Sequence, residues 1–301
     1  EISLGLVGSE MCIRDRLGPD AQFELEWVSV YTFACERMDT FRHGRVLFAG
    51  DSAHRVSPFG ARGANSGVQD AENLAWKLKL VLAGQAPESL VDSYAAEREH
   101  AADENILNSS RATDFITPKS DISRSFRNAV LNLARHHPFA RSLVNSGRLS
   151  LPATYADSPL NTPDTDAFAG RMRPGAVALD APVRGPGGSD WWLSRLSGSF
   201  TLALFCGDQP PAPDTLQALQ ALRLAAVPVT PVLVAGAHCD TSAWPADLAH
   251  VVDSEGLLAQ RYDAGPGTAY LIRPDQHISA RWRAFAPDAV ASAIQRATGR
   301  A

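Results

Sequence analysis

The pattern of apolar and polar positions in the first half of the chain predicts two strands followed by helices. Apolar and polar residues alternate over 23–33, and an apolar run at 46–49 is typical of a strand covered on both faces. Apolar residues then recur at helical spacing from Asn65 to Ala83, with Gly84 as the expected stop. The apolar face of that helix is predicted to consist of Val68, Ala71, Leu74, Ala75, Leu78, Val81 and Leu82. Further helices are expected after Pro87 and over 123–146.

The second half shows a different alternation of strand and helix patterns. Residues 200–207, FTLALFCG, predict a buried strand, and two strands within 267–285 are joined at Pro274-Asp275. The other expected elements are helix 213–225, strand 227–236, short strand 249–253, helix 256–264 and helix 287–299. This order predicts an α/β layer domain that ends in an antiparallel pair of strands.

The same patterns divide the chain into four segments. Residues 1–16 show no sustained period and are interpreted as a non-native stretch. Residues 17–150 form the first predicted domain, and 170–301 form the α/β domain. Between them, 151–169 is rich in proline, serine and acidic residues, which is typical of a linker.

Composition narrows the classes of function. The formal net charge of −5 and the lack of a basic stripe argue against a nucleic-acid partner. No apolar run approaches the roughly 20 residues that span a membrane, so no membrane association is expected. The four cysteines form no C-x-x-C pair and have no zinc-finger spacing with histidine, so we expect reduced thiols in a cytoplasmic protein and no metal site.

The stretch GRVLFAGDSAHRVSPFGARGAN, residues 44–65, carries the candidate chemistry. Asp51 follows a predicted buried strand, where a carboxylate can accept hydrogen bonds from the hydroxyls of a ribose or ribityl chain. The loop then places the backbone amides of 63–65 at a helix start, which favours an electron-rich group. Taken alone, Gly50-Asp51 could equally end a strand, with the other glycines serving turns.

The complete spaced set is more specific. Residues 50–78 read G-D-x-A-H-x-x-x-P-x-G-x-x-G-x-N-x-G-x-x-D-A-x-N-L-A-W-K-L, which resembles the second flavin motif of the FAD-dependent aromatic monooxygenases typified by phenol hydroxylase and para-hydroxybenzoate hydroxylase. The stretch LVDSYAAER at 90–98 resembles the next helix of that family. The resemblance implies part of a glutathione-reductase-like FAD-binding domain. Its cofactor-binding residues would be Gly50, Asp51, Pro58, Gly60, Arg62, Gly63, Ala64 and Asn65.

Two residues of this motif admit two interpretations each. The sequence G-A-R-G-A-N at 60–65 replaces the commoner G-G-Q-G-M-N, while the glycines that matter for the backbone are expected to be kept. Arg62 therefore either adds a positive charge beside the flavin or is a solvated loop side chain. His54 could be a base, but in the resembled family it belongs to the structural loop, so we assign no catalytic residue.

The last domain resembles the thioredoxin-like C-terminal domain of phenol-hydroxylase-type members. Element order and the stretch YLIRPDQHISARWR carry this resemblance. Cys206-Gly207-Asp208-Gln209 stands where thioredoxins have a dithiol, and the second cysteine is missing. Dithiol–disulfide chemistry is therefore not expected. Packing and oligomer contacts, including those of a homodimer, are the roles we consider for this domain.

The first phosphate-binding turn of such enzymes, G-x-G-x-x-G between a strand and a helix, is absent, and GPGGSD at 185–190 lacks the preceding strand and the third glycine. We therefore expect the chain to be the carboxyl-terminal half of a longer enzyme. The resemblance implies an FAD- and NAD(P)H-dependent monooxygenase that hydroxylates a phenolic substrate with O2 through a flavin C4a-hydroperoxide. The alternatives are another flavin oxygenation, such as epoxidation, or a non-catalytic binding or assembly protein built on the thioredoxin-like domain.

Overall fold

The computed structural model describes residues 13–24, 26–27, 32–58, 60–144, 151–185, 187–196, 198–242, 244–245 and 247–301. The chain divides into two compact units, Glu1–Ala34 and Cys35–Ala301. In the first unit, residues 13–17 are helical. The strand expected at 23–33 falls partly outside the described residues, and its described residues form no strand. The second unit contains all the elements discussed below. None of the helices in the described ranges is both long and apolar enough to cross a bilayer.

Two short antiparallel ladders open the second unit. β1 (Glu36–Arg37) pairs with β4 (His54–Arg55), and β2 (Arg42–His43) pairs with β3 (Val46–Leu47). The buried strand expected at 46–49 is therefore wrong, because β3 covers two residues and Val46 is 56% exposed. Its only strand partner among the described residues is β2. Residues 36–44 contain both β1 and β2.

Long helices follow these ladders. α2 (Arg62–Leu82) ends where Gly84 takes a positive φ of 67°, so the predicted stop is confirmed. η2 (Glu88–Val91) leads into α3 (Asp92–Ile116), as expected after Pro87. The single helix expected at 123–146 is two helices, α4 (Asp121–His136) and α5 (Pro138–Val144), because Pro138 cannot continue the hydrogen-bond ladder. Residues 145 and 146 lie outside the described residues.

α2 does not bury the apolar face that its spacing predicts. Val68 is 66% and Leu82 is 84% exposed. The buried side chains of α2 are instead Ser66, Asp70, Asn73, Trp76, Lys77 and Leu80. Its buried face is thus largely polar near the middle and apolar only toward the end, where Trp76 packs edge-on against Phe200 with ring centroids 5.6 Å apart.

The second half forms one mixed seven-stranded sheet. Its strands, in chain order, are β5 (Pro182–Gly185), β6 (Gly188–Trp191), β7 (Phe200–Gly207), β8 (Val229–Ala235), β9 (Ala249–Val252), β10 (Ala269–Ile272) and β11 (Ile278–Trp282). They lie in the spatial order β11-β10-β7-β8-β9-β5-β6, with β7, β8 and β9 parallel and the other pairs antiparallel. The predicted strands of this half and their closing antiparallel pair are confirmed. The β5–β6 hairpin was not predicted. GPGGSD begins at the last residue of β5 and ends inside β6, so the expectation that no strand precedes it is wrong, although a strand and not a helix follows.

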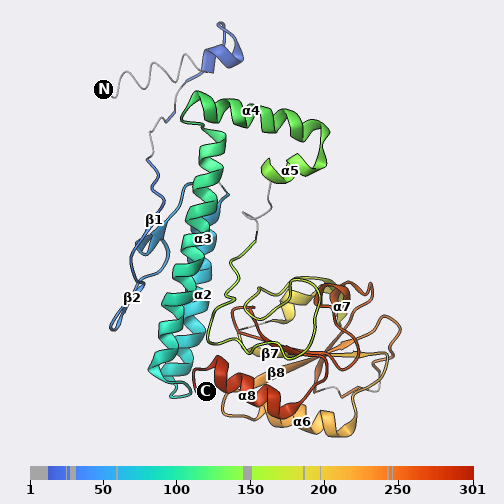
Figure 1. The fold of residues 1–301 in the computed structure, drawn as a ribbon. Coiled ribbons are helices and arrows are strands. Elements are labelled where there is room, and N and C mark those ends of the chain that lie inside the picture. Colours follow the sequence, from blue (N-terminus) through green and yellow to red (C-terminus); the bar gives the residue numbers. More distant parts are fainter. Residues whose placement is uncertain are drawn as a thin grey trace. The chain divides into compact units, whose positions relative to one another are not determined.

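Helices cover both faces of this sheet (Figure 1). α6 (Pro213–Arg223) and α8 (Pro287–Ala297) bury leucine, valine and alanine side chains in one core cluster, whereas α7 (Leu257–Tyr262) contributes to the other. These helices confirm the α/β class. Trp76 and Leu80 of α2 share the first cluster with β7 and α8, so α2 and the sheet have a common core. The domain boundaries themselves stay predictions.

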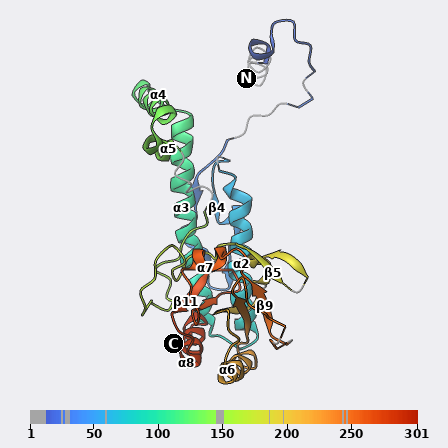
Figure 2. The same ribbon diagram turned by 90° about the vertical axis from the view of Figure 1, so that its right-hand side faces the viewer.

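The segment 151–169 contains no helix or strand, yet it is packed against the rest of the unit. Tyr155 is 3% and Leu160 is 3% exposed. Thr162 donates its amide hydrogen to the Ser279 carbonyl at 2.8 Å. The long helices α2 and α3 run lengthwise beside each other, and their lower ends reach the level of the sheet (Figure 2). The Tyr155 hydroxyl accepts a hydrogen bond from Arg98 of α3 at 2.6 Å. Residues 151–169 therefore lie against both α3 and the sheet.

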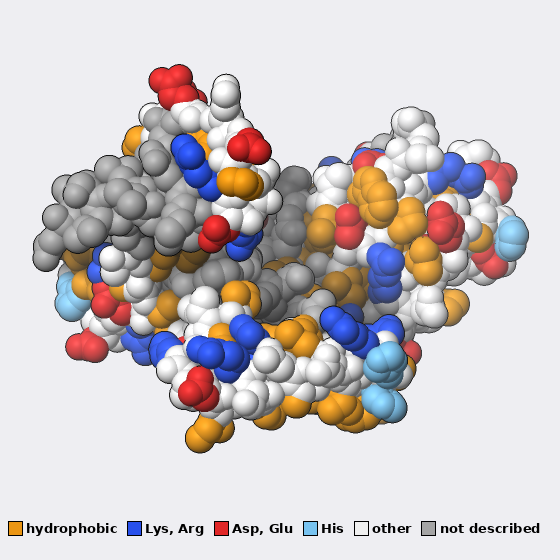
Figure 3. All heavy atoms as spheres, turned by 90° about the horizontal axis from the view of Figure 1, so that it is seen from above, with side chains coloured by type: hydrophobic (Ala, Val, Ile, Leu, Met, Phe, Trp, Pro, Cys, Tyr) orange, Lys and Arg blue, Asp and Glu red, His pale blue; other side chains and the backbone are white. Residues whose placement is uncertain are grey.

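α4 is the most amphipathic helix, but its apolar stripe faces outward. Ile122 is 84%, Phe126 is 64% and Leu133 is 42% exposed, and Val130 is the one buried residue of α4. Seen from above, apolar side chains alternate with basic ones on this part of the surface (Figure 3). α4 therefore adds little to the core of the described chain.

Candidate functional site

The eight residues predicted to bind the cofactor lie in two stretches that meet at α2. Gly50 and Asp51 begin the short helix η1 (Gly50–Ser52). The others are Pro58 and Gly60 in the turn before α2, and Arg62, Gly63, Ala64 and Asn65 in its first turn. η1 packs directly on α2, since a Cβ placed on Gly67 would lie 3.4 Å from the Gly50 Cα. Two facing glycines allow this approach.

Asp51 lies in a 3-10 turn and not at the end of a buried strand, which corrects the expectation from the sequence. Its side chain is exposed. Within the described ranges its carboxylate has no hydrogen-bond partner. A carboxylate in this position is free to accept hydrogen bonds from a ligand, and its contact with a ribityl chain stays a prediction.

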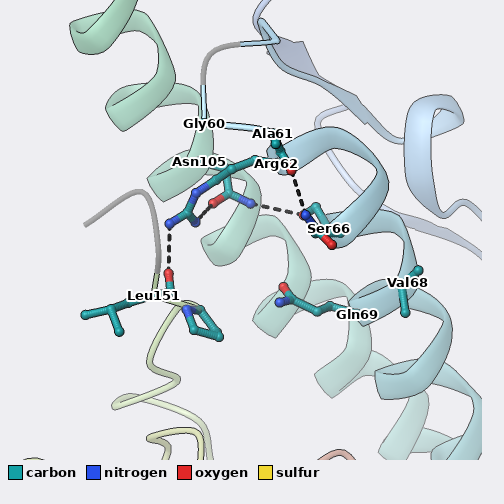
Figure 4. A pocket seen from close by; sticks show the side chains of 10 residues that line it. Gly60, Ala61, Arg62, Ser66, Val68, Gln69, Asn105 and Leu151 are labelled. Carbon is teal, nitrogen blue, oxygen red and sulfur yellow. Dashed lines mark hydrogen bonds between the residues drawn. The ribbon is translucent and has the colours of Figure 1, made fainter. Parts of the chain in front are cut away.

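A cavity of about 420 Å³ opens at the start of α2 (Figure 4). Gly60, Arg62 and Asn65 line it together with Asn105 of α3 and Leu151, whereas the other five predicted residues do not. Its volume lies within the range of about 300–1,000 Å³ that is typical of small-molecule sites. The N-cap residue of α2, Ala61, makes no side-chain capping bond, so within the described residues the backbone amides of the first turn are available to an electron-rich group.

Two residues at the start of α2 differ from what the sequence predicts. Ala61, the residue before α2, has a left-handed backbone with φ 51°, so the glycines needed for backbone shape are not all kept. Arg62 donates to the Asn105 side-chain oxygen and, at 2.8 Å, to the Leu151 carbonyl. The interpretation of Arg62 as a solvated side chain is therefore wrong. Its positive charge is held at the wall of the cavity, as Figure 4 shows.

Asp70 of α2 holds the Gly50–Asp51 turn in place. Its fully buried carboxylate accepts hydrogen bonds from the Gly50 amide at 2.8 Å, His54 Nε2 at 2.7 Å and Arg98 Nε at 2.5 Å. Burial alone would raise the pKa of Asp70, but the His54 hydrogen bond and the Arg98 charge lower it below its ordinary value. His54 lies in β4, is 2% exposed and stacks on Phe41, so its ring is enclosed by the protein.

Sequence reasoning missed Asp70 and its partner Arg98 because it followed apolar periodicity. The signal that could have found the first of them is a polar stripe, since Ser66, Asp70, Asn73 and Lys77 recur at helical spacing on one face of α2. Asp70 also belongs to the spaced motif itself. When the face of a helix that packs against the protein carries a polar stripe, the stripe indicates a buried hydrogen-bond network more than a solvated face.

Several known proteins are similar to this chain. A family model described as an FAD binding domain matches residues 14–109. The chain is 33% identical over 273 residues to 6-methylpretetramide 4-monooxygenase of Streptomyces rimosus, covering 87% of this chain and 46% of that protein. It is 55% identical over 76 residues to the probable NADH-specific resorcinol 4-hydroxylase of Rhodococcus jostii, covering 25% of this chain and 14% of that protein.

The fold is also found among solved structures. The flavin-dependent monooxygenase PieE, solved in complex with FAD and substrate, matches with a TM-score of 0.75 at 21% identity, covering 98% of this chain and 54% of PieE. The chain spans about half the length of the relatives that it matches along most of its own length. Residues 14–109 thus match the model of an FAD binding domain, and the chain is similar over most of its length to a pretetramide monooxygenase and, in fold, to a flavin-dependent monooxygenase solved with FAD.

Proposed function

We propose that this chain supplies the part of an FAD-dependent aromatic monooxygenase that faces the flavin ring and ribityl chain. The observation that carries the proposal is the exposed Asp51, which has no hydrogen-bond partner among the described residues, on a turn fixed beside the start of α2. One group accepts hydroxyl hydrogens and the other attracts an electron-rich edge, which together suit a flavin. The family match over residues 14–109 supports this choice of ligand.

Each residue would make a different contact with the cofactor. Asp51 would accept a hydrogen bond from a ribityl hydroxyl. The amides of Gly63, Ala64 and Asn65 would face the N1–C2 edge of the isoalloxazine, and Arg62 would add a positive charge that favours an anionic group. When bound, FAD would supply the redox chemistry with NAD(P)H and O2, while the protein positions and electrostatically stabilises it.

The substrate we propose is an electron-rich aromatic ring that carries hydroxyl groups. The names of the relatives, a pretetramide monooxygenase and a resorcinol hydroxylase, support this class. The second of these is described as NADH-specific, which supports a nicotinamide co-substrate. Epoxidation on the same scaffold and a non-catalytic assembly role remain the competing hypotheses. We further propose a cytoplasmic location, and the homodimer stays a proposal.

Flavin titration of the 301-residue chain tests the proposed function. We expect saturable quenching of flavin fluorescence by the chain. Riboflavin and FAD should bind within about tenfold of each other, because the residues on this chain would contact the ring and ribityl chain. Asp51→Ala should weaken binding on the order of ten- to a hundredfold, since a hydrogen bond to a charged group contributes roughly 1.5–3 kcal/mol. Asp51→Asn should be milder, because its amide oxygen still accepts.

Asp39→Ala is the matched control, since Asp39 is also an exposed aspartate and lies outside the motif at 50–78. It should bind flavin like wild type. The free energy of unfolding of the Asp51→Ala apoprotein should lie within about 0.5 kcal/mol of the wild-type value, as is usual for surface substitutions. Absence of saturable binding, or strong destabilisation by Asp51→Ala with unchanged affinity, would contradict the proposed function.

A further inference from the structure

The turn between β10 and β11 carries a buried arginine that reaches out of its own domain. Arg273 is 1% and Asp275 is 4% exposed. The Arg273 guanidinium donates to both carboxylate oxygens of Glu97 on α3, at 2.6 and 2.8 Å, and to both oxygens of Asp275, at 3.0 and 2.6 Å. Such fork-shaped contacts restrict orientation as well as distance. The turn is therefore held to α3 in one defined geometry.

The same two carboxylates bind α2. Asn73 donates from its amide nitrogen to Glu97 at 2.8 Å and to Asp275 at 2.9 Å. Lys77 donates to Glu97 at 2.7 Å. Burial would raise the pKa of Glu97, but the charges of Arg273 and Lys77 hold it well below its ordinary value. Two helices and one turn of the sheet domain thus share a single buried cluster of charges.

A second set of contacts leads from the same turn to the Gly50–Asp51 turn. The His277 ring stacks on the Tyr155 ring with centroids 4.4 Å apart. The Tyr155 hydroxyl accepts from Arg98 at 2.6 Å, and Arg98 in turn donates to Asp70. Asp70 then accepts the Gly50 amide hydrogen. Glu97 and Arg98 are neighbours on α3, so this helix connects both sets of contacts.

We propose that Arg273 is a positioning residue for the Gly50–Asp51 turn. It acts through Glu97 and α3 to keep Asp70 against the Gly50 amide. Only the identity of the ligand at that turn rests on the proposed function. The C-terminal domain would then do more than pack or support oligomers, because its β10–β11 turn would determine where Asp51 lies. No residue of that domain needs to touch the ligand for this role.

Hydrogen exchange at the Gly50 amide tests the proposal in the flavin-free 301-residue chain. Arg273→Gln should raise the exchange rate of this amide by at least about tenfold, because the hydrogen bond to Asp70 opens more often. Arg273→Lys keeps a positive charge beside Glu97 but loses the fork-shaped pair of hydrogen bonds, so the Gly50 exchange rate should fall between those of wild type and Arg273→Gln. Residue-resolved NMR exchange gives the measurement.

Arg281→Gln is the matched control. Arg281 is 6% exposed in β11 and pairs with Asp164 at 3.0 and 2.6 Å. Its loss should leave Gly50 exchange within about twofold of wild type, since the two pairs share no partner. The Leu204 amide in β7 reports general loosening. If Arg273→Gln speeds exchange at Leu204 and Gly50 by the same factor, or leaves Gly50 unchanged, the positioning role is overturned.

A variant that fails to fold and a wild-type chain that binds no FAD are handled separately. If Arg273→Gln does not fold, Arg273→Lys and Asp275→Asn are measured by the same Gly50-to-Leu204 comparison, and equal rises at both amides again overturn the proposal. FAD titration of Arg273→Lys should show weaker binding than the Arg281→Gln control. If wild type binds no FAD, the proposed function fails, whereas the exchange comparison still decides the positioning role.

Discussion

Replacing Asp70 by alanine should destabilise the apoprotein strongly. The change removes the only carboxylate that faces the Arg98 guanidinium among the described residues, and both side chains are at most 1% exposed. It also leaves the Gly50 amide and His54 Nε2 without their acceptor. Removing one partner of a buried ion pair costs about 3–5 kcal/mol, because the remaining charge stays buried. Native domains are stable by about 5–15 kcal/mol, so this is a large share.

The expected melting shift follows from that magnitude. A domain of this size loses about 2–4 °C per kcal/mol, so Asp70→Ala should melt roughly 6–20 °C lower than wild type. Asp70→Asn should lose about half as much, because one amide oxygen can still accept the Gly50 hydrogen. Urea titration followed by circular dichroism, with a thermal melt alongside, gives both quantities without flavin.

Asp92→Ala is the control for this measurement. Asp92 pairs with Arg42 at 2.8 Å, but its side chain is 68% exposed, so the loss should stay below about 1 kcal/mol. If Asp70→Ala is as stable as Asp92→Ala, Asp70 is not the anchor of the Gly50–Asp51 turn. The reasoning from burial and hydrogen bonding would then be refuted.

Three other predictions follow from the same structure. Ala61→Gly should raise stability by roughly 0.5–1 kcal/mol in urea titration, because alanine at φ 51° is strained, whereas Ala64→Gly inside α2 should lower it. Stability should fall as the pH drops below about 4.5, because Arg273 holds the pKa values of the buried Glu97 and Asp275 carboxyls below their ordinary 4.5 and 3.8 and the unfolded chain therefore binds more protons in acid. Urea midpoints measured from pH 7 to 3 should show this fall, and Glu97→Gln should make the midpoint depend less on pH. Burial raises the pKa of the Cys206 thiol to about 12, so iodoacetamide should modify Cys206 more slowly in the native chain than in urea, and equal rates would contradict this.

The C-terminal sheet was largely predictable from local pattern. β7, β8 and β10 are short apolar runs bounded by turn residues, and each is buried on both faces, so hydrophobicity and position agree. The β5–β6 hairpin escaped notice because its residues include arginine, serine and aspartate and it lies at the sheet edge. Edge strands are half solvated, so their sequence carries little apolar signal.

The positions of the helices in the first half were predicted correctly, but the side chains that these helices bury were not. Spacing located α2 and α3, and Gly84 marked the end of α2. The buried face of α2 could not be read from apolar residues, because Asp70, Asn73 and Lys77 are buried against partners on α3 and on the β10–β11 turn. A polar side chain is buried only when a partner satisfies it, and that partner can lie far along the chain.

The sequence by itself determined the spaced motif at 50–78, the resemblance that names FAD as the expected ligand, and the order of strands and helices in the last domain. These depend on neighbouring residues, whose conformational preferences and spacing are local properties. Only the tertiary structure decided that Asp51 is exposed on a turn, that Arg62 is held by Asn105, and that Asn73 meets Asp275 across 202 positions. Contacts at such separation arise from packing whole elements together, and no periodicity along the chain encodes which buried charge finds which partner.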